Sequence, residues 1–475
     1  MTISPKAKWI GLVCAFGLSG CNFAPTYHAP QTAAPPVYKE AGDWSPSAPA
    51  DGGPRGDWWL SFSDPTLNDL IARLEAASPT LAAAAARYDQ AIAVAAQGNA
   101  ALFPSLDARG SAVRQRLSGE RPLAAGPATY HDFIVGLGAS YELDLWGRVR
   151  NLVRSGEANR QASAADLASV RLSLEAQCSE LYFQLRGLDA QITLLDDTVA
   201  AYSRALQLTD ARYQDGAASG LDVGRARTQL STAKAQRTEL AATRALTEHA
   251  LAALVGELPT AFSIPASATN PTPSVVPTTA PSALLQRRPD VAGAERRMAA
   301  ANARIGIQRA AFFPTISLNA SAGYETTGGD LLTAPASFWA IGPATALLSV
   351  FDGGQRRAAV DAAKGAFDEA AANYRATVLT AFRDVEDQMA LVNRLATEAK
   401  DEDDAVVAAT RTADLALTRY NEGAASYLEV VTAQTAELDA RRTALTLNTR
   451  RLQASVDLIR ALGGGWEIAV ADAQP

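Results

Sequence analysis

Two periodicities alternate along the chain, and each predicts one kind of secondary structure. Apolar residues recur at helical spacing through residues 148–213, in the series Leu167, Val170, Leu174, Leu181, Leu185, Leu188, Ile192 and Leu195. This spacing predicts one helix of about 100 Å, because each helical residue adds about 1.5 Å. Ordinary helices have three or four turns, so a helix of this length must pack along its length against others like it.

Shorter segments alternate apolar and polar residues with period two and predict β-strands. The clearest are 315–324 and 133–146, and the weaker matches are 105–114 and 337–351. Alternation over about ten residues is typical of a strand between lipid and water. The same pattern fits a half-buried strand of a soluble sheet. No stretch beyond the leader approaches the roughly 18–20 apolar residues of a membrane helix, which favours membrane strands.

The chain is a tandem duplication. The segment Arg212–Val223 recurs as Arg419–Val430 with eight of twelve positions identical, and three further pairs follow in the same order. These pairs are 102–106 with 312–316, 145–148 with 351–354, and 254–256 with 461–463. We predict repeats at 66–256 and 282–463, with a linker at 257–281 and a C-terminal tail at 464–475; that the linker is equatorial is implied only by the family resemblance given below.

Each repeat is expected to hold a helix, two strands and a long helical hairpin. The strands are predicted near 103–118 and 132–146, then near 313–326 and 337–352; the hairpins are predicted at 147–256 and 353–463. Four residues are expected to form the hairpin turns: Gly216 and Gly423 as left-handed caps that end a helix, and Ser219 and Ser426 as caps that begin the next. Asp222 and Glu429 follow these serines at capping-box spacing.

The strand count predicts an oligomer. One chain supplies four strands, too few to close a barrel, and an open sheet edge is not tolerated in lipid. Closure begins near eight strands, whose interior is filled by side chains. Three chains would supply twelve strands around an open lumen, so we expect a homotrimer.

The amino-terminal residues predict a lipoprotein leader. Lys6 and Lys8 precede an apolar run at 9–18, which is too short to span a bilayer. Leu18-Ser19-Gly20-Cys21 then resembles the bacterial lipobox, which implies a signal peptide at 1–20 and lipidation of Cys21. An ordinary secretory signal with an incidental cysteine is the alternative. Asn22 in place of aspartate implies the outer membrane, and 21–65 are expected to be a lipidated tether.

Composition argues against other classes of function. The 475 residues carry a formal net charge of −7, and nucleic-acid binding needs a clustered basic surface. His28, His131 and His249 show no metal-ligand spacing, and no nucleophile motif or phosphate loop is present. We therefore expect no enzyme, no catalytic residue, no metal and no cofactor. Cys178 is expected to be a small buried hydrophobic residue.

A segment at 285–306, here called the signature segment, resembles the TolC-type outer-membrane factors. It reads Leu285-Gln286-Arg287-Arg288-Pro289-Asp290-Val291, then Ala294-Glu295-Arg296-Arg297 and Ala300-Ala301-Asn302-Ala303-Arg304-Ile305-Gly306. Phe313-Pro314, Phe351-Asp352-Gly353-Gly354 and the two hairpin turns fit as well, and the lipidated branch with OprM, CusC and NodT is most similar. In the signature itself, Arg287, Arg288, Pro289, Asp290 and Glu295 are interpreted as structural residues that begin a helix.

The resemblance implies a fold class, partners and a role. It implies a trimeric twelve-stranded β-barrel in the outer membrane, four strands from each chain, continuous with a long periplasmic α-helical barrel. It implies docking by a periplasmic adaptor and an inner-membrane pump, of the resistance-nodulation-division class, with substrate leaving through the tube. The alternatives are a type I protein-secretion duct and a periplasmic coiled-coil scaffold lipoprotein.

The resemblance also assigns roles to the hairpin turns. Asp222 and Glu429 match acidic residues that line a periplasmic gate, and Tyr213 and Tyr420 match groups that hold the closed coils together. Thr432 stands where the family has a second aspartate. Adaptor contact is expected at Gly216, Ser219, Gly423 and Ser426. The competing interpretation makes Asp222 and Glu429 helix caps only, and it gives the turn residues no partner.

Overall fold

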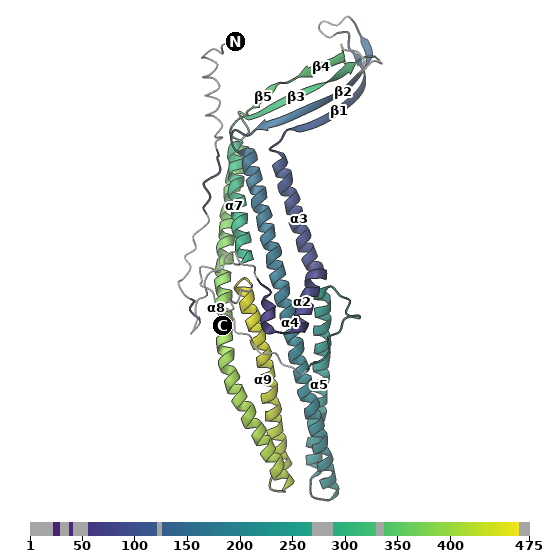
Figure 1. Ribbon diagram of the computed structural model, residues 1–475, viewed down its shortest axis with the longest axis vertical. Coiled ribbons are helices and arrows are strands. Elements are labelled where there is room, and N and C mark those ends of the chain that lie inside the picture. The colour runs from purple at the N-terminus through teal and green to yellow at the C-terminus, as the bar shows by residue number, and fades with distance from the viewer. Residues whose placement is uncertain are drawn as a thin grey trace, which may run out of the picture. The chain divides into compact units, whose positions relative to one another are not determined.

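The computed structural model describes residues 22–28, 38–40, 56–120, 126–267, 288–328 and 337–464. The predicted signal peptide, Cys21, Arg287, linker residues 268–281 and tail residues 465–475 lie outside the described residues. The elements, labelled in Figure 1, are η1 (Trp58–Phe62), α2 (Pro65–Ala77), α3 (Pro79–Ala100), β1 (Ser105–Leu117), β2 (Ala128–Leu143), α4 (Arg148–Gln214), α5 (Gly220–Val255), α7 (Pro289–Ala310), β3 (Thr315–Thr326), β4 (Phe338–Ile341), β5 (Ala344–Leu347), α8 (Gln355–Asn421) and α9 (Tyr427–Ala461).

The chain forms two compact units, and each draws on both repeats. One holds the described parts of Met1–Gln31, Tyr88–Ser163 and Gly293–Tyr374, and it contains the β-sheet. The other holds the described parts of Thr32–Arg87, Ala164–Ala292 and Arg375–Pro475, and it contains the two helical hairpins. The duplication in sequence is thus interleaved in space.

The sheet is antiparallel, with the order β1-β2-β3-β4 and with β5 also paired to β3. The segment predicted as a single strand at 337–352 forms two short strands instead, β4 and β5. Gly342 and Pro343 separate them, and a proline has no N–H to continue the ladder. The Pro343 carbonyl still accepts a hydrogen bond of 3.0 Å from the Asn319 N–H.

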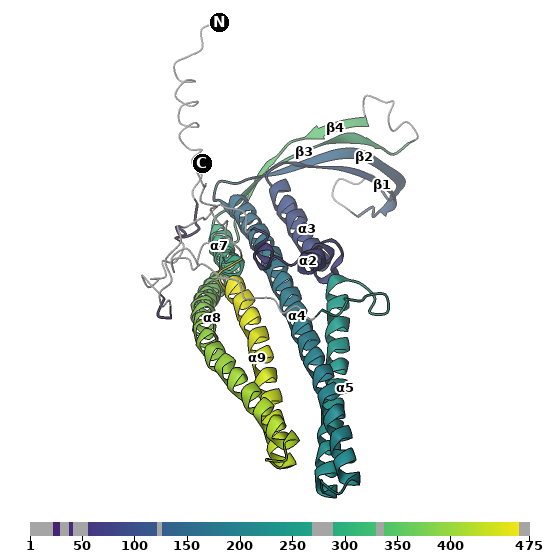
Figure 2. The same ribbon diagram turned by 60° about the horizontal axis from the view of Figure 1, so that its bottom comes forward.

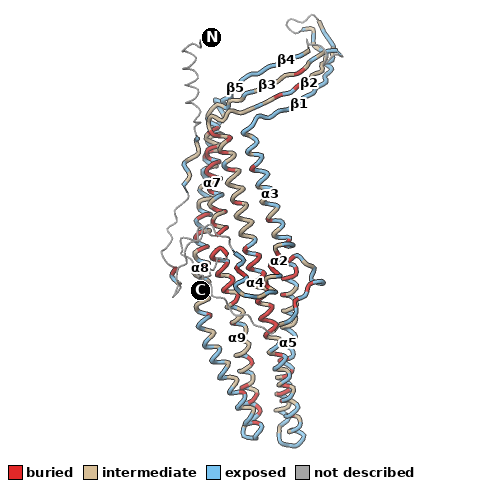
Figure 3. Tube along the Cα trace, viewed as in Figure 1, coloured by how far each residue is buried: buried red, intermediate tan, exposed pale blue. Residues whose placement is uncertain are grey.

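The strand register gives the sheet one apolar and one mainly polar face. Ser105 pairs with Ser140, which pairs with Asn319, and these residues mark the polar face. The neighbouring residues along each strand point to the opposite, apolar face. This face includes Leu106, Phe133, Val135, Leu137, Ala139, Tyr141, Leu143, Ile316, Leu318, Ala320, Ala322 and Tyr324. Both faces expose many residues in this chain, as Figure 3 shows for the strands.

An aromatic cluster lies at the start of the sheet. Phe23 stacks on Phe313 with ring centroids 4.4 Å apart, and Phe313 stacks on Trp146 at 4.8 Å. The Trp146 Nε1–H donates to the Pro314 carbonyl at 2.8 Å. These contacts join the Trp146 and Phe313-Pro314 motifs of the two repeats to the segment 22–27.

One face of α7 holds the segment 22–27. Asn302 Nδ2 donates to the Pro25 carbonyl at 2.8 Å, and Arg309 Nη1 donates to the Phe23 carbonyl at 3.2 Å. The Tyr27 hydroxyl donates to Glu295 Oε1 at 2.5 Å. Glu295 therefore binds the N-terminal segment in addition to lying near the start of the helix.

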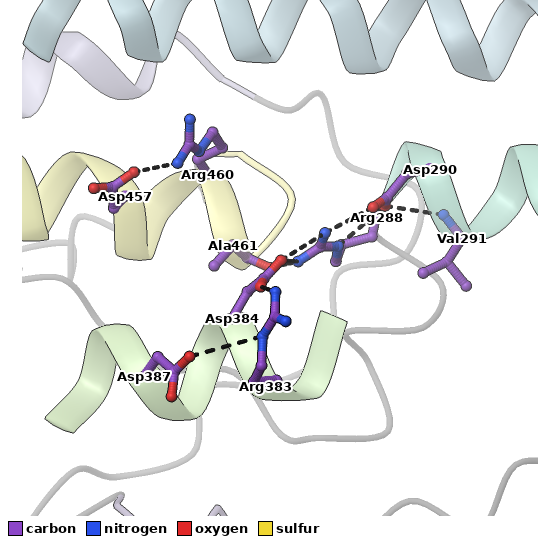
Figure 4. A network of polar contacts seen from close by, with 9 residues as sticks. All are labelled: Arg288, Asp290, Val291, Arg383, Asp384, Asp387, Asp457, Arg460 and Ala461. Carbon is purple, nitrogen blue, oxygen red and sulfur yellow. Dashed lines mark hydrogen bonds and ion pairs between the residues drawn. The ribbon is translucent and has the colours of Figure 1, made fainter. Parts of the chain in front are cut away.

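The signature segment begins α7 and ties it to both helices of the second hairpin. The Arg288 guanidinium donates to Asp290 Oδ2 at 2.7 Å, to Asp384 Oδ2 at 3.4 Å and to the Ala461 carbonyl at 3.2 Å (Figure 4). Pro289 is the first residue of α7, and Asp290 is acidic in its first turn. Because Arg288 is almost fully buried, these bonds satisfy a charge that would otherwise be costly.

The hairpin unit has its main core around α2 and α4. Leu67, Leu70, Ile71 and Leu74 of α2 are fully buried, as are Tyr182, Phe183 and Leu185 of α4. A few residues further along α4, the Asp189 carboxylate accepts three hydrogen bonds. They come from Arg244 Nε at 2.6 Å, from Arg186 Nη1 at 3.1 Å and from the Ser267 N–H at 3.2 Å. This buried network fixes the described start of the linker against the first hairpin.

Two further expectations concern single features. Cys178 is a free, fully buried thiol, as predicted, and burial raises its pKa to about 12. Among the helices of the described residues, none combines the length and the hydropathy needed to cross a bilayer.

Candidate functional site at the hairpin turns

The first hairpin turn joins α4 to α5, which lie side by side in Figures 1 and 2. Gly216 has φ of 75°, the left-handed conformation that ends a helix without a side-chain penalty. Ser219 begins α5, and its hydroxyl accepts from the Asp222 N–H at 3.2 Å, while Asp222 Oδ2 accepts from the Ser219 N–H at 3.3 Å. Asp222 also contacts Arg225 at 3.5 Å.

The second hairpin turn joins α8 to α9 in the same way. Gly423 has φ of 77°, and the Ala424 N–H donates to the Arg419 carbonyl at 2.8 Å. Glu429 Oε1 accepts from the Ser426 N–H at 3.0 Å and from its hydroxyl at 3.2 Å. The turn glycines and cap serines therefore have the local roles that the sequence predicts.

The electrostatics of Glu429 keep it ionised. Hydrogen bonds from Ser426, and in addition the positive charge of Arg419, lower the pKa of the Glu429 carboxyl. The carboxylate is also at the solvent-exposed end of the hairpin, so holding the negative charge there requires no desolvation. The two acids predicted together, Asp222 and Glu429, each cap their own helix.

The two predicted tyrosines lie in different surroundings. Tyr420 is 7% exposed and packs against Tyr427 with ring centroids 5.3 Å apart. Tyr213 is 53% exposed, and a Cβ added to Gly220 would lie 3.6 Å from its ring. The difference follows from the repeat itself, because Tyr427 occupies the position that Gly220 has in the first copy.

A residue that the sequence analysis did not single out links the two turns. Arg212, in the last turn of α4, donates to the Tyr420 carbonyl at 2.9 Å and to the Asn421 carbonyl at 2.8 Å. Its guanidinium also lies 4.6 Å from the centroid of the Tyr420 ring. These carbonyls end α8, so Arg212 of the first hairpin caps a helix of the second. Its place as a basic residue in a last helical turn was the available sequence signal.

The repeat mate of Arg212 makes no such link. Arg419 Nη2 donates to the Ala424 carbonyl within its own turn at 3.3 Å, and this contact is exposed. Tyr427, also missed by the sequence analysis, is buried with Val430 and Ala226. Burial raises the pKa of the Tyr427 hydroxyl to about 12, so it stays protonated at neutral pH.

A groove of about 590 Å³ lies beside these turns, between α5 and α9. Its lining includes apolar residues and several polar ones: Tyr202, Leu221, Arg225, Gln229, Val431 and Leu438. Leu221 and its repeat mate Leu428, each two residues after its cap serine, are 62% and 49% exposed. Of these two leucines, Leu221 lines the groove.

Among the described residues, no group of three or more His, Cys, Asp and Glu side chains could hold a metal ion. The hairpin turns hold two acids at helix starts, one arginine that contacts the other hairpin, and a groove lined in part by apolar residues.

Comparison with known proteins places these features in a family context. The sequence profile of a family described as Outer membrane efflux protein matches residues 70–257 and 280–464. The chain is 32% identical over 458 residues to the antibiotic efflux pump outer membrane protein ArpC of Pseudomonas putida, covering 96% of this chain and 94% of ArpC. It is 34% identical over 423 residues to the pyoverdine export outer membrane protein OpmQ of Pseudomonas aeruginosa, with 86% of this chain and 87% of OpmQ covered. Its structure matches the outer-membrane channel OprN with a TM-score of 0.86 and 28% identity, over 94% of this chain and all of OprN.

Proposed function

Because the chain belongs to the outer membrane efflux protein family, we propose that three copies form the exit duct of a tripartite efflux system. In this role the sheet lies in the outer membrane and the helical hairpins extend into the periplasm. Relatives that match over most of their length are named as an antibiotic efflux pump outer membrane protein and a pyoverdine export outer membrane protein. A duct conducts and does not catalyse, so the proposal assigns no reaction to the chain.

The sheet edges are the observation that carries the trimer. Within the described residues, β1 pairs only with β2, while β4 and β5 pair only with β3. Both edges of the sheet are therefore open, and open edges are not tolerated in lipid. If β4 and β5 count as one strand position, each copy supplies four positions, and pairing β1 of one copy with β4 and β5 of the next closes a barrel of twelve positions from three copies.

Lipidation of Cys21 is part of the proposal. The next residue, Asn22, accepts a hydrogen bond of 2.9 Å from Asn151 of α4, and Phe23 joins the aromatic cluster at the start of the sheet. Acyl chains on Cys21 would begin two residues before Phe23 of this cluster. That position suits a lipid anchor in the inner leaflet of the outer membrane.

The hairpin turns are proposed to bind a periplasmic adaptor and to form the gate. The groove between α5 and α9, with Leu221 beside it, supports the adaptor surface near Gly216, Ser219, Gly423 and Ser426. The exposed position of Glu429 in the first turn of α9 supports the gate, since three such carboxylates brought into a ring would bind cations and close the duct. An inner-membrane pump of the resistance-nodulation-division class would complete the system and select the substrate.

Heat-modifiable migration on gels tests the assembly. The purified full-length protein should run as a trimer in mild detergent without boiling and as a monomer after boiling, because a closed β-barrel resists detergent. A truncated sheet lacking 337–347 removes one edge and should abolish the trimer band. A protein that migrates as a folded monomer under all conditions would contradict the duct and favour a coiled-coil scaffold.

A further inference from the structure

Two arginines lie close together near the C-terminal end of β1. Arg114 and Arg116 are two residues apart on one strand, so their side chains share a face. The register pairs Arg114 with His131 and Arg116 with Thr129 of β2. Both arginines are exposed, and within the part of the chain that the structure describes neither makes a hydrogen bond or an ion pair.

This face is the apolar one. The even-numbered residues of β1 share a face with the odd-numbered residues of β2, which include Phe133, Val135 and Leu137. The carboxylates near this end of the sheet, Asp132 and Glu325, lie on the other face. The two guanidinium groups therefore adjoin a continuous apolar surface with no carboxylate among its described strand residues.

Closing the barrel would bring no acidic strand residue to the face that carries Arg114 and Arg116. In the proposed trimer the open edge of β1 meets β4 and β5 of the next subunit. Their residues on the apolar face are Phe338, Ala340, Ala344 and Ala346, as the pairing with β3 shows. None of these residues is acidic, so the positive charge of Arg114 and Arg116 would remain unpaired on the outside of the barrel.

The position of the arginines along the strand matches a membrane boundary. Arg114 lies nine residues beyond Ser105, about 30 Å along the strand at roughly 3.3 Å per residue. With the usual tilt of about 40° this is roughly 23 Å across the membrane, close to the apolar band of about 25 Å on such barrels.

Aromatic residues mark the same boundary. Tyr324 and Phe338 are in edge contact with centroids 5.7 Å apart, and Phe133 stacks on His131 at 5.9 Å. Aromatic side chains of this kind gather where hydrocarbon meets headgroups. The strand leaves the helices at Ser105, so this boundary is the one away from the periplasm.

We propose that Arg114 and Arg116, with His131 beside them, bind the phosphate groups of a phosphorylated glycolipid in the outer leaflet. The inference rests on the proposed function, which places the sheet in the outer membrane. A guanidinium group binds phosphate through two parallel hydrogen bonds. The acyl chains of the same lipid would lie along Val135, Leu137 and Ala139, which a free phosphate ion would leave uncovered.

Lipid binding by the intact trimer tests the site. Full-length protein in lipid nanodiscs would be titrated with bis-phosphorylated lipid A and, separately, with the same lipid after removal of both phosphates. The variant Arg114→Gln/Arg116→Gln is expected to bind bis-phosphorylated lipid A at least about tenfold more weakly than the wild type. Affinity for the dephosphorylated lipid should be the same for both proteins.

The same strand offers a matched control. Arg109 belongs to the opposite, polar face, where its guanidinium lies over Gly138, so Arg109→Gln should keep wild-type affinity for lipid A. Equal binding by Arg114→Gln/Arg116→Gln and the wild type would overturn the site. Full competition by millimolar inorganic phosphate would also overturn it, because that result describes a free-anion site.

The heat-modifiable trimer band separates this test from the test of the duct. If the band is present in every variant, lipid binding alone decides the proposed site. If the double variant does not assemble, Arg116→Gln alone would be titrated, and it is expected to weaken binding by several fold. Wild-type binding by that assembled single variant, or equal wild-type affinity for the two forms of the lipid, would contradict the proposal.

Discussion

The arginines at the two hairpin turns have equivalent places in the repeat and different contacts. Arg212 caps α8 and covers the Tyr420 ring, whereas Arg419 contacts only its own turn. Charge-assisted bonds to two helix-end carbonyls and a ring contact are together worth on the order of 1–2 kcal/mol in a partly exposed site. The contact between the two turns should therefore depend on Arg212 more than on Arg419.

We predict that Arg212→Ala loosens the end of the second hairpin. Amide hydrogen exchange at 418–427 should rise several fold, because the Tyr420 and Asn421 carbonyls lose their donor. Arg419→Ala removes the same charge from the equivalent position and should change exchange at 418–427 much less. Equal effects of the two substitutions would show that the contact across the hairpins contributes nothing.

A buried acid on α4 makes stability depend on pH. Glu175 accepts from Trp58 Nε1 at 3.1 Å and from Arg171 Nε at 3.2 Å, and burial raises its pKa to about 7. A carboxyl group with a raised pKa binds its proton more tightly in the folded chain than in the unfolded one. Its contribution therefore falls as pH rises from 4.5 to 7, by about 3 kcal/mol in all.

Glu175→Gln should remove this dependence. The amide oxygen can still accept from Trp58, but it carries no charge to desolvate. The melting temperature of the variant, relative to the wild type, should rise between pH 5 and pH 8. Glu75→Gln, which loses contact with the same Arg171, controls for the lost ion pair. A difference between Glu175→Gln and the wild type that is independent of pH would contradict the assignment.

Sequence reasoning reached the local chemistry of the turns and missed the contacts between them. The glycines and cap serines follow from rules that involve only neighbours along the chain. The burial of Tyr420 and the capping by Arg212 depend on the other hairpin, far away in sequence. Two signals were available in the sequence: Arg212 is a basic residue in a last helical turn, and Tyr427 replaces Gly220 in the second copy.

At the scale of elements, α7 has a role that its periodicity did not reveal. The polar residues of the signature segment bind two partners: Arg288 holds α8 and α9, and Glu295 and Asn302 hold the segment 22–27. Gly306 completes this face, since a Cβ there would lie 2.7 Å from the Ala24 Cβ. Only glycine allows the N-terminal segment to approach the helix so closely.

We predict that Gly306→Ala displaces the N-terminal segment. The added methyl group would also lie 2.5 Å from Asn151 Nδ2, so Asn22 and Ala24 must move and their amides should exchange faster. Gly365→Ala on α8 is the matched control, because a Cβ there meets nothing within 4 Å. That control should stabilise its helix by up to about 1 kcal/mol. Unchanged protection at 22–27 in Gly306→Ala would show that the close approach is unimportant.

The alternation of apolar and polar residues predicts where the strands lie but not where a strand is interrupted. Alternation predicted segments that the structure shows as β1, β2 and β3, because each has one apolar face. The break between β4 and β5 was missed, since Gly342 and Pro343 interrupt the backbone without disturbing the alternation of side chains. The Gly-Pro pair, rather than the hydrophobic pattern, was the sequence feature that indicated the break between β4 and β5.

For the whole molecule, the central inference is that an incomplete sheet requires two further copies of the chain. Its edges are open, its apolar face is exposed and its fold is that of outer-membrane efflux channels. The fold class was predictable because the duplication and the strand pattern leave few arrangements that satisfy every backbone group in lipid. The substrate was not predictable, because a wide duct has no need of a recognition site.

Single-channel conductance in planar bilayers shows whether the assembled chain is a gated duct, when the wild type is compared with Glu429→Ala and with Asp222→Ala. Both substitutions remove a capping acid, so any effect of capping is shared between them. We predict a small resting conductance that rises in Glu429→Ala by more than in Asp222→Ala, with weaker block by divalent cations. Equal conductance in all three proteins would keep the duct and move the gate elsewhere. No conductance from a protein shown to be a folded trimer would contradict the duct itself.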